Sequence, residues 1–287
     1  MTRASEKYFP YGLLSPALLL FIGLLFIPLV LTVILSFYSF NSMSGIIPTF
    51  TTHNYKAIFT DPYYIGIFGR TGGMALLVTL LCLLFGIPET IILSRMKSPW
   101  RGLCLVLILG PLLVSVVVRT LGWSILMGRE GLINDFLVFT GLADSPVRML
   151  YTMTGVVIAL VHVLIPFMII SIWASLRKLD PWVENAAQSL GGSSFVVYRR
   201  IVIPQLLPGI LSGSIIVFAL SASAFATPAL IGGRRLKVVA TAAYDEFLSS
   251  LNWPLGAAIA LLLLIANLAV IMGANKLIER KYKHIFH

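Results

Sequence analysis

Three side chains with polar groups stand out because they interrupt long apolar runs. Glu89 lies near the end of one such run, and Arg119 and Trp123 lie close together in another. Because ionisable groups inside a bilayer are costly, such residues are candidates for contact with a transported solute. We therefore take Arg119, Trp123 and Glu89 as candidate residues of a substrate path. The alternatives are a snorkelling or carbonyl-paired arginine, an interfacial carboxylate and an interfacial-belt tryptophan.

Motifs for catalysis or metal binding are absent from the sequence. It contains no G-x-x-x-x-G-K-[ST] phosphate-binding loop, no H-E-x-x-H zinc motif and no G-x-S-x-G nucleophile elbow. Cys82 and Cys104 both lie in apolar runs, and we interpret them as small buried apolar residues. His162 shares an apolar stretch with Pro166 and is expected to be packed and hydrogen-bonded. We expect no enzyme activity and no metal or cofactor bound by this chain.

The composition of the 287 residues identifies a membrane protein. Hydrophobic residues make up 58% of the chain and charged residues only 11%, whereas a soluble domain has about 25% charged residues. This composition excludes a disordered chain and an ordinary cytosolic enzyme. The formal net charge is +10, yet the basic residues are dispersed along the chain. Nucleic-acid binding needs them on one face among aromatic residues, so we expect no nucleic-acid partner.

Six apolar stretches are long enough to cross a membrane, since a helix needs roughly 20 mostly apolar residues to span the hydrocarbon core. These stretches are residues 13–37, 65–93, 103–127, 150–176, 208–231 and 254–278. The first is longer than the core of a cleavable signal peptide, so we expect it to be retained. The sequence thus predicts an all-α, polytopic membrane protein with six transmembrane helices.

The distribution of Lys and Arg between the loops predicts the orientation, because cytoplasmic loops carry the positive charge. One alternate set of segments, which includes both termini, holds thirteen basic residues, and the other set holds six. We therefore expect both termini to be cytoplasmic. The six bases expected on the outer side are Lys56, Arg129, Arg148, Arg234, Arg235 and Lys237.

The longest expected cytoplasmic loop, residues 177–207, has clear helix signals. Asp180 before Pro181 is typical of a helix start, and Gly191 with its following glycine is typical of a helix end. A second helix is expected to run to about Ile203. Such a segment is a candidate docking element for a cytoplasmic partner. The alternative is an amphipathic segment that lies on the lipid headgroups.

The spacing within this loop resembles the EAA loop of permease subunits of binding-protein-dependent ABC importers. The pattern of that loop is E-A-A, three residues, G, nine residues and I-x-L-P. The matching positions here are Asn185, Ala186, Ala187, Gly191, Ile201 and Pro204. Two positions depart from the pattern: Asn185 stands at the acidic position, directly after Glu184, and Ile203 replaces the leucine.

The resemblance implies a fold and a set of partners. It implies the type I fold of ABC importer permeases in a bacterial inner membrane, with a peripheral helix and outer loop in 1–64, a core domain in 65–278 and a basic tail in 279–287. In that family the loop docks on a cytoplasmic ATPase, so Glu184 through Gly191 would transmit ATP-driven closure. The implied partners are two ABC ATPase subunits that bind ATP and Mg, a second homologous permease and an extracytoplasmic solute-binding protein.

Three further segments narrow the family, namely those that begin at Val118 (VRTLGW), Ala226 (ATPALIGG) and Asn252 (NWPLGAA). They resemble the first permease of spermidine/putrescine-type importers, which implies a polyamine or related small polar solute. Aminoethylphosphonate, iron and thiamine are alternative solutes within the same importer class. A secondary transporter driven by an ion gradient and a membrane scaffold without transport activity are the rival classes. Secondary transporters usually show repeated halves and mid-membrane ion-coupling groups, and we see neither in this sequence.

Overall fold

The computed structural model describes residues 3–178 and 181–282. The expected helix cap at Asp180 and residues 283–287 of the basic tail lie outside these ranges. The chain forms two compact units, Met1–Ile65 with Ala242–Leu264, and Gly66–Thr241 with Ile265–His287. The boundaries between the units fall inside three helices, α3 (Pro62–Arg95), α11 (Val239–Leu248) and α12 (Trp253–Tyr282).

The first unit contains a β-hairpin that the all-α expectation missed. Helix α1 (Arg3–Ser36) leads into strands β1 (Tyr38–Asn41) and β2 (Gly45–Phe50), which pair antiparallel. Phe37 stacks on Phe50 with ring centroids 5.0 Å apart. The side chain of Asn54, in helix α2 (His53–Thr60), donates to the carbonyls of Ser36 and Tyr38 at 2.8 and 3.0 Å. These contacts fix the chain reversal after the first apolar helix.

Among the described residues, five helices are long and apolar enough to cross a membrane, or six if one bent pair forms a single span. These five segments are Leu14–Ser36, Pro62–Arg95, Met153–Leu176, Phe195–Ala222 and Trp253–Lys276. Four of the expected spans are found at the predicted places. The apolar parts of α1 and α3 correspond to the first and second spans, α7 (Met153–Leu176) to the fourth, and the apolar part of α12 to the sixth.

The third expected span, 103–127, is not a straight helix. Helices α4 (Trp100–Leu109) and η1 (Gly110–Leu113) form one arm and α5 (Val116–Leu126) forms the other, with a bend of 103° between them. Pro111, within η1, has no N–H to donate. Val114 and Ser115, which connect η1 to α5, are extended, with ψ of 138° and 135°. The helical hydrogen bonding therefore stops here and restarts in a new direction.

The fifth expected span, 208–231, was placed too late in the chain. The apolar helical segment begins at Phe195 and passes without interruption through η2 (Tyr198–Val202) into α10 (Ile203–Ala222). It ends at Ser223, and a separate short helix, η3 (Pro228–Gly232), follows. Pro204 and Pro208 lie inside this continuous helix, and the wider turn of η2 precedes them.

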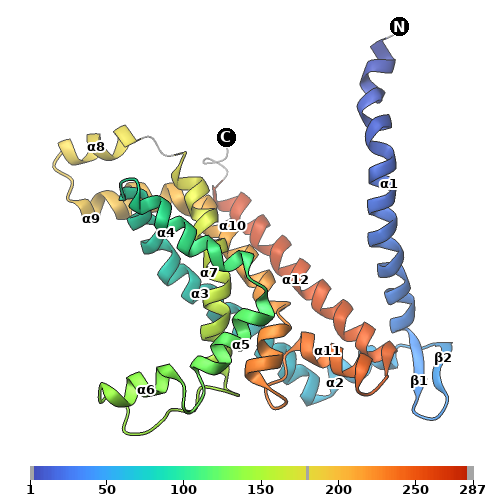
Figure 1. Cartoon of the computed structure of the whole chain (residues 1–287). Helices are drawn as coiled ribbons and strands as arrows, with labels where there is room; N and C mark the ends of the chain where they lie inside the picture. The colour runs from blue at the N-terminus through green and yellow to red at the C-terminus, as the bar shows by residue number, and fades with distance from the viewer. Residues whose placement is uncertain (1–2, 179–180, 283–287) are drawn as a thin grey trace. The chain divides into compact units, whose positions relative to one another are not determined.

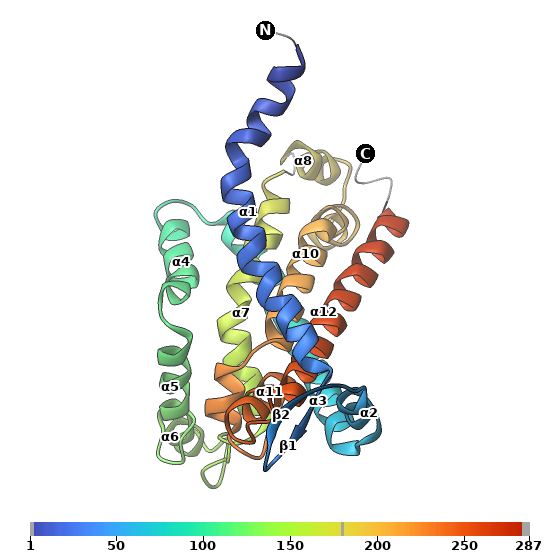
Figure 2. The same ribbon diagram turned by 90° about the vertical axis from the view of Figure 1, so that its right-hand side faces the viewer.

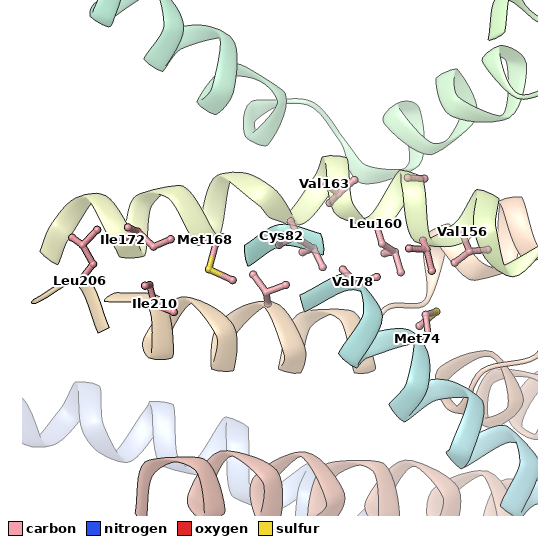
Figure 3. Close-up of a cluster of buried hydrophobic side chains, with 14 of the residues drawn as sticks. Met74, Val78, Cys82, Val156, Leu160, Val163, Met168, Ile172, Leu206 and Ile210 are labelled. Carbon is pink, nitrogen blue, oxygen red and sulfur yellow. The ribbon is translucent and has the colours of Figure 1, made fainter. Parts of the chain in front are cut away.

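The core of the second unit is formed by buried residues of α3, α7 and α10. Helices α7 and α10 run side by side (Figures 1 and 2). Figure 3 shows Met74, Val78 and Cys82 of α3 directed toward Leu160 and Met168 of α7. Cys82 is buried and its thiol is free, as expected from the sequence.

Two glycines of α10 set its distance from α7. A Cβ at Gly209 would lie 2.5 Å from the Ser171 carbonyl oxygen, and one at Gly213 would lie 2.8 Å from the Met168 sulfur. Small residues at four-residue spacing allow such close approach in membranes. This G-x-x-x-G motif therefore packs within the subunit.

Candidate functional site

The expected docking loop contains a short helix, α8 (Pro181–Ser189), which lies where the sequence predicts it. The chain leaves the helix through Gly191, whose φ is +84°. The N–H of Gly191 donates to the Gln188 carbonyl at 2.9 Å, and the N–H of Gly192 donates to the Ala187 carbonyl at 3.1 Å. This is the left-handed helix end that glycine favours. The side chains of Glu184 and Asn185 lie outside the described part of the chain.

Both glycines constrain the turn, for different reasons. At Gly191 a Cβ would meet no described atom of this chain within 4 Å, so glycine is favoured here because of the positive φ. At Gly192 a Cβ would lie 2.8 Å from the Ala187 carbonyl oxygen, so glycine is needed here because a side chain has no room. The two together fix the direction in which the chain leaves α8.

The loop is attached to the apolar core of the second unit. Ala187 and Ile201 pack against that core, and Val197, at the end of α9 (Ser194–Val197), and Val202 are buried in it. The guanidinium of Arg95, at the end of α3, lies 4.8 Å from the ring centroid of Tyr198. These contacts attach α8 and α9 to α3, α7 and α10.

The helix changes its winding where the loop joins the membrane segment. Residues Tyr198–Val202 form the π-helix η2, directly before Pro204 in the first turn of α10. Because proline has no N–H and its ring collides with the carbonyl four residues earlier, a regular α-helical turn is unfavourable here. A π-turn relieves that conflict and is a common feature of functional sites.

Apolar side chains on this loop are exposed in the isolated subunit. Leu190 is 89% exposed, Phe195 is 72% exposed, and Val183 and Val196 are also exposed. Large exposed apolar groups that lie close together mark an interaction surface. The loop thus has an anchored side and an uncovered apolar side.

The candidate path residues fall in two places. Arg119 and Trp123 lie on α5, next to His162 of α7. Glu89 lies near the end of α3, seven residues beyond Cys82, whose thiol points to the Val161 carbonyl at 3.8 Å. At 1.5 Å per residue, Glu89 lies about 10 Å further along the helix than the level of His162. The described contacts therefore do not place Glu89 with the other two.

His162 is held by Trp123. The indole Nε1–H donates to His162 Nδ1 at 3.1 Å, and the two rings meet edge to face with centroids 5.4 Å apart. The expected hydrogen bond of His162 is confirmed, but its side chain is exposed in the subunit and not packed as expected. Because Nδ1 accepts, the proton of the neutral imidazole lies on Nε2, which is a donor.

Arg119 adds further donors to this group. Its Nε and Nη1 atoms are buried and have no hydrogen-bond partner among the described residues. Next to it, the hydroxyl of Thr120 lies 3.2 Å from that of Thr227, which joins α5 to the segment before η3. We call Arg119, Trp123 and His162 the donor cluster. Because the Trp123 N–H is donated to His162, the N–H groups left for another partner are those of Arg119 and the Nε2–H of His162.

We expect Trp123→Phe to destabilise the donor cluster. The substitution keeps an aromatic ring but removes the donor to His162, and a lost hydrogen bond of this kind costs about 1 kcal/mol. Thermal unfolding of the purified variant should occur a few degrees lower. The matched control is Trp253→Phe, at a half-exposed tryptophan whose side chain has no hydrogen bond within the described part of the chain. An equal shift in both variants would show that ring size, not the hydrogen bond, is responsible.

Comparison with solved structures identifies the fold. The chain matches the crystal structure of a bacterial alginate ABC transporter in complex with an alginate pentasaccharide-bound periplasmic protein. The TM-score is 0.82, with 17% sequence identity and coverage of 98% of each chain. The fold is that of an ABC importer permease subunit.

Comparison with known sequences identifies the family, although no family model matches the chain. The chain is 32% identical over 259 residues to the spermidine/putrescine transport system permease protein PotB of Escherichia coli, with coverage of 89% of this chain and 94% of that protein. It is 31% identical over 198 residues to the molybdenum transport system permease protein ModB of Mycobacterium bovis, with coverage of 69% and 73%. The chain therefore belongs to the family of ABC importer permeases that includes PotB. It is a multi-pass protein of the bacterial inner membrane and a transport subunit, not an enzyme.

Proposed function

We propose that this permease subunit imports a polyamine such as spermidine or putrescine. The observation that carries the proposal is the 32% identity to PotB across almost the whole of both chains. The energy would come from ATP hydrolysis on partner subunits, because this sequence has no phosphate-binding loop of its own. The ATP and its Mg would thus be bound by the ATPases and not by this chain.

We propose that α8 and the turn after it, Glu184 to Gly191, form the coupling element. The exposed apolar groups Leu190 and Phe195 would be covered by the ATPase, while Ala187 and Ile201 transmit its movement to the core helices. Pro204 and the π-turn before it would be the joint between loop and membrane segment. Closure of two ATPase subunits would then pull this loop and that of the second permease together.

The rest of the assembly follows from the same proposal. A second, homologous permease would complete the path through the membrane, and an extracytoplasmic binding protein would deliver the solute. Both termini would be cytoplasmic, in accord with the distribution of basic residues. The long apolar helices, most clearly α1 with no buried residues in its apolar window, would face membrane lipid.

The donor cluster favours one alternative solute class. The Arg119 guanidinium repels a polycation, whereas its N–H groups and that of the His162 imidazole bind an oxygen acceptor, such as the acid group of aminoethylphosphonate. If Arg119 and Trp123 line the path, a solute that carries an acid would suit them better than a polyamine. Glu89, a carboxylate on α3, is the candidate path residue that suits an amine.

The solute class can be tested with the purified complex of both permeases and the ATPases in lipid vesicles. We expect ATPase stimulation by a solute-binding protein loaded with spermidine or putrescine. Stimulation only by a binding protein loaded with aminoethylphosphonate would show that the solute is the aminophosphonate and not a polyamine. If no ATPase copurifies with the permease, the proposed docking role of residues 177–207 is wrong.

A further inference from the structure

A pocket of about 460 Å³ lies at the start of α7 in the second unit. Its floor is apolar and includes the buried side chains of Met127 and Met149. The exposed residues Arg129, Arg148 and Tyr151 also line it. An apolar floor together with two arginines in the lining is suited to an occupant that carries an acid group on an apolar stem.

The walls of the pocket are fixed by one buried asparagine. The side-chain amide of Asn134, in α6 (Leu132–Phe139), donates to the carbonyls of Gly128 and Val147 at 2.8 and 3.1 Å. Its side-chain oxygen accepts from the N–H of Val147 at 2.8 Å. The segment that carries Arg129 is thereby joined to the segment that carries Arg148.

The third wall is fixed by Tyr151, which has a φ of +63°. Its N–H donates to the Ile231 carbonyl at 2.8 Å. Its ring lies against Gly233, where an added Cβ would come within 2.6 Å. A non-glycine residue with positive φ is held in place only by surrounding structure, so this wall is preorganised.

Neither guanidinium of the pocket is neutralised within the subunit. Among residues 3–178 and 181–282, no side-chain hydrogen bond or ion pair involves the guanidinium of Arg129 or Arg148. The loop that packs on Tyr151 carries two more exposed bases, Arg234 and Arg235. Glu130, Asp135 and Asp144 lie in the neighbouring parts of the chain, but the lining of the pocket itself holds two bases and no acid, which suits an acidic partner.

The pocket and the coupling element lie at opposite ends of α7. The pocket is lined by residues just before Met153, where α7 begins, and α8 follows Leu176, where α7 ends. Figures 1 and 2 show α6 and α8 at these two ends. A helix of 24 residues is about 36 Å long, enough to cross the hydrocarbon core. If α8 docks on a cytoplasmic ATPase, the pocket opens on the extracytoplasmic side.

We propose that this pocket receives an acidic side chain of the solute-binding protein, so that Arg129 and Arg148 hold that protein on the permease. The inference rests on the proposed function, which places the binding protein on this side. A carboxylate on a short apolar stem matches both the guanidinium groups and the floor formed by Met127 and Met149. A lipid phosphate shares the charge, but its acyl chains would need a long apolar channel, and the test separates the two.

The test uses the complete permease–ATPase complex in phosphatidylcholine vesicles and the solute-binding protein that stimulates it, loaded with spermidine. The measured quantity is the concentration of binding protein that gives half-maximal ATPase stimulation. For the double variant Arg129→Ala/Arg148→Ala we expect this concentration to rise about 10-fold or more, as truncation of charged contacts at an interface does. Basal ATPase activity and maximal stimulation should stay unchanged, and Arg148→Lys should retain part of the affinity.

The control is Arg101→Ala, which removes the same charge from an exposed position in α4. It should not change the half-maximal concentration. Raising the ionic strength from about 0.05 to 0.5 M should weaken the wild type more than the double variant, because salt screens exposed charges.

Three outcomes would contradict the proposal, and they can be distinguished. A shift of less than about 2-fold in the double variant, with the wild type still stimulated, would show that the pocket does not hold the binding protein. If phosphatidylglycerol raises wild-type activity and the double variant loses that response, the pocket takes lipid phosphate instead. A wild-type complex that no loaded binding protein stimulates would contradict the proposed function itself.

Discussion

We expect Gly191→Val to lower solute uptake by about 10-fold or more while the complex still assembles. Gly191 has a φ of +84°, which a β-branched residue adopts only at a cost of about 1–3 kcal/mol. The turn would relax to another conformation and redirect α8 relative to the core that holds Ala187. The measurement is uptake by vesicles, together with ATPase stimulation by the loaded binding protein. Uptake and ATPase stimulation should fall together, because the substitution disrupts the coupling between the ATPase and the membrane helices.

The matched variant Gly191→Asn separates backbone conformation from space. Asparagine tolerates a positive φ, and a Cβ at this position meets no atom of the subunit within 4 Å. We expect Gly191→Asn to keep most of the uptake if the turn conformation alone matters, and to lose it if the ATPase approaches the backbone closely. Normal uptake and stimulation in an assembled Gly191→Val complex would exclude the proposed coupling role of this turn.

We expect Gly209→Leu to prevent stable folding of the second unit. A Cβ at this position would lie 2.5 Å from the Ser171 carbonyl oxygen and 2.9 Å from the Ile172 Cα, both backbone atoms of α7. Two helices must separate to accept the side chain, and overpacking in a dense core costs about 1–3 kcal/mol or more. The amount of monodisperse complex after purification should fall strongly, and its thermal unfolding should occur at a lower temperature.

Gly273→Leu is the control for this variant. Gly273 also lies in a membrane helix, α12, but a Cβ there would meet nothing within 4 Å. The same gain in side-chain volume should therefore leave the yield and the unfolding temperature almost unchanged. Equal losses in both variants would show that glycine content, rather than contact between α10 and α7, is responsible.

Local signals in the sequence were sufficient to predict the helix of the docking loop and its end. Pro181 favours a helix start, and the glycine pair at 191 and 192 favours a helix end, and α8 occupies this interval. The length of the apolar stretches was sufficient to predict the spans formed by α1, α3, α7 and α12. Each of these signals acts over a few neighbouring residues and needs no knowledge of distant contacts.

The features that the sequence did not reveal depend on contacts between distant segments. The bend of 103° before α5 lies inside an apolar stretch long enough for one straight helix. The buried Asn134 joins carbonyls 19 residues apart, at positions 128 and 147. The pairing of Trp123 with His162 spans 39 positions. No periodicity in a single sequence specifies which partner such a polar group finds.

The most direct test of the central claim is polyamine uptake by vesicles that contain this permease, its partner permease and the ATPases. With loaded binding protein outside and ATP inside, we expect labelled spermidine or putrescine to accumulate, and uptake to be absent when this chain is omitted. Dissipation of proton and sodium gradients should leave the initial rate unchanged. Uptake by this chain alone, driven by an ion gradient and independent of ATP, would contradict the account.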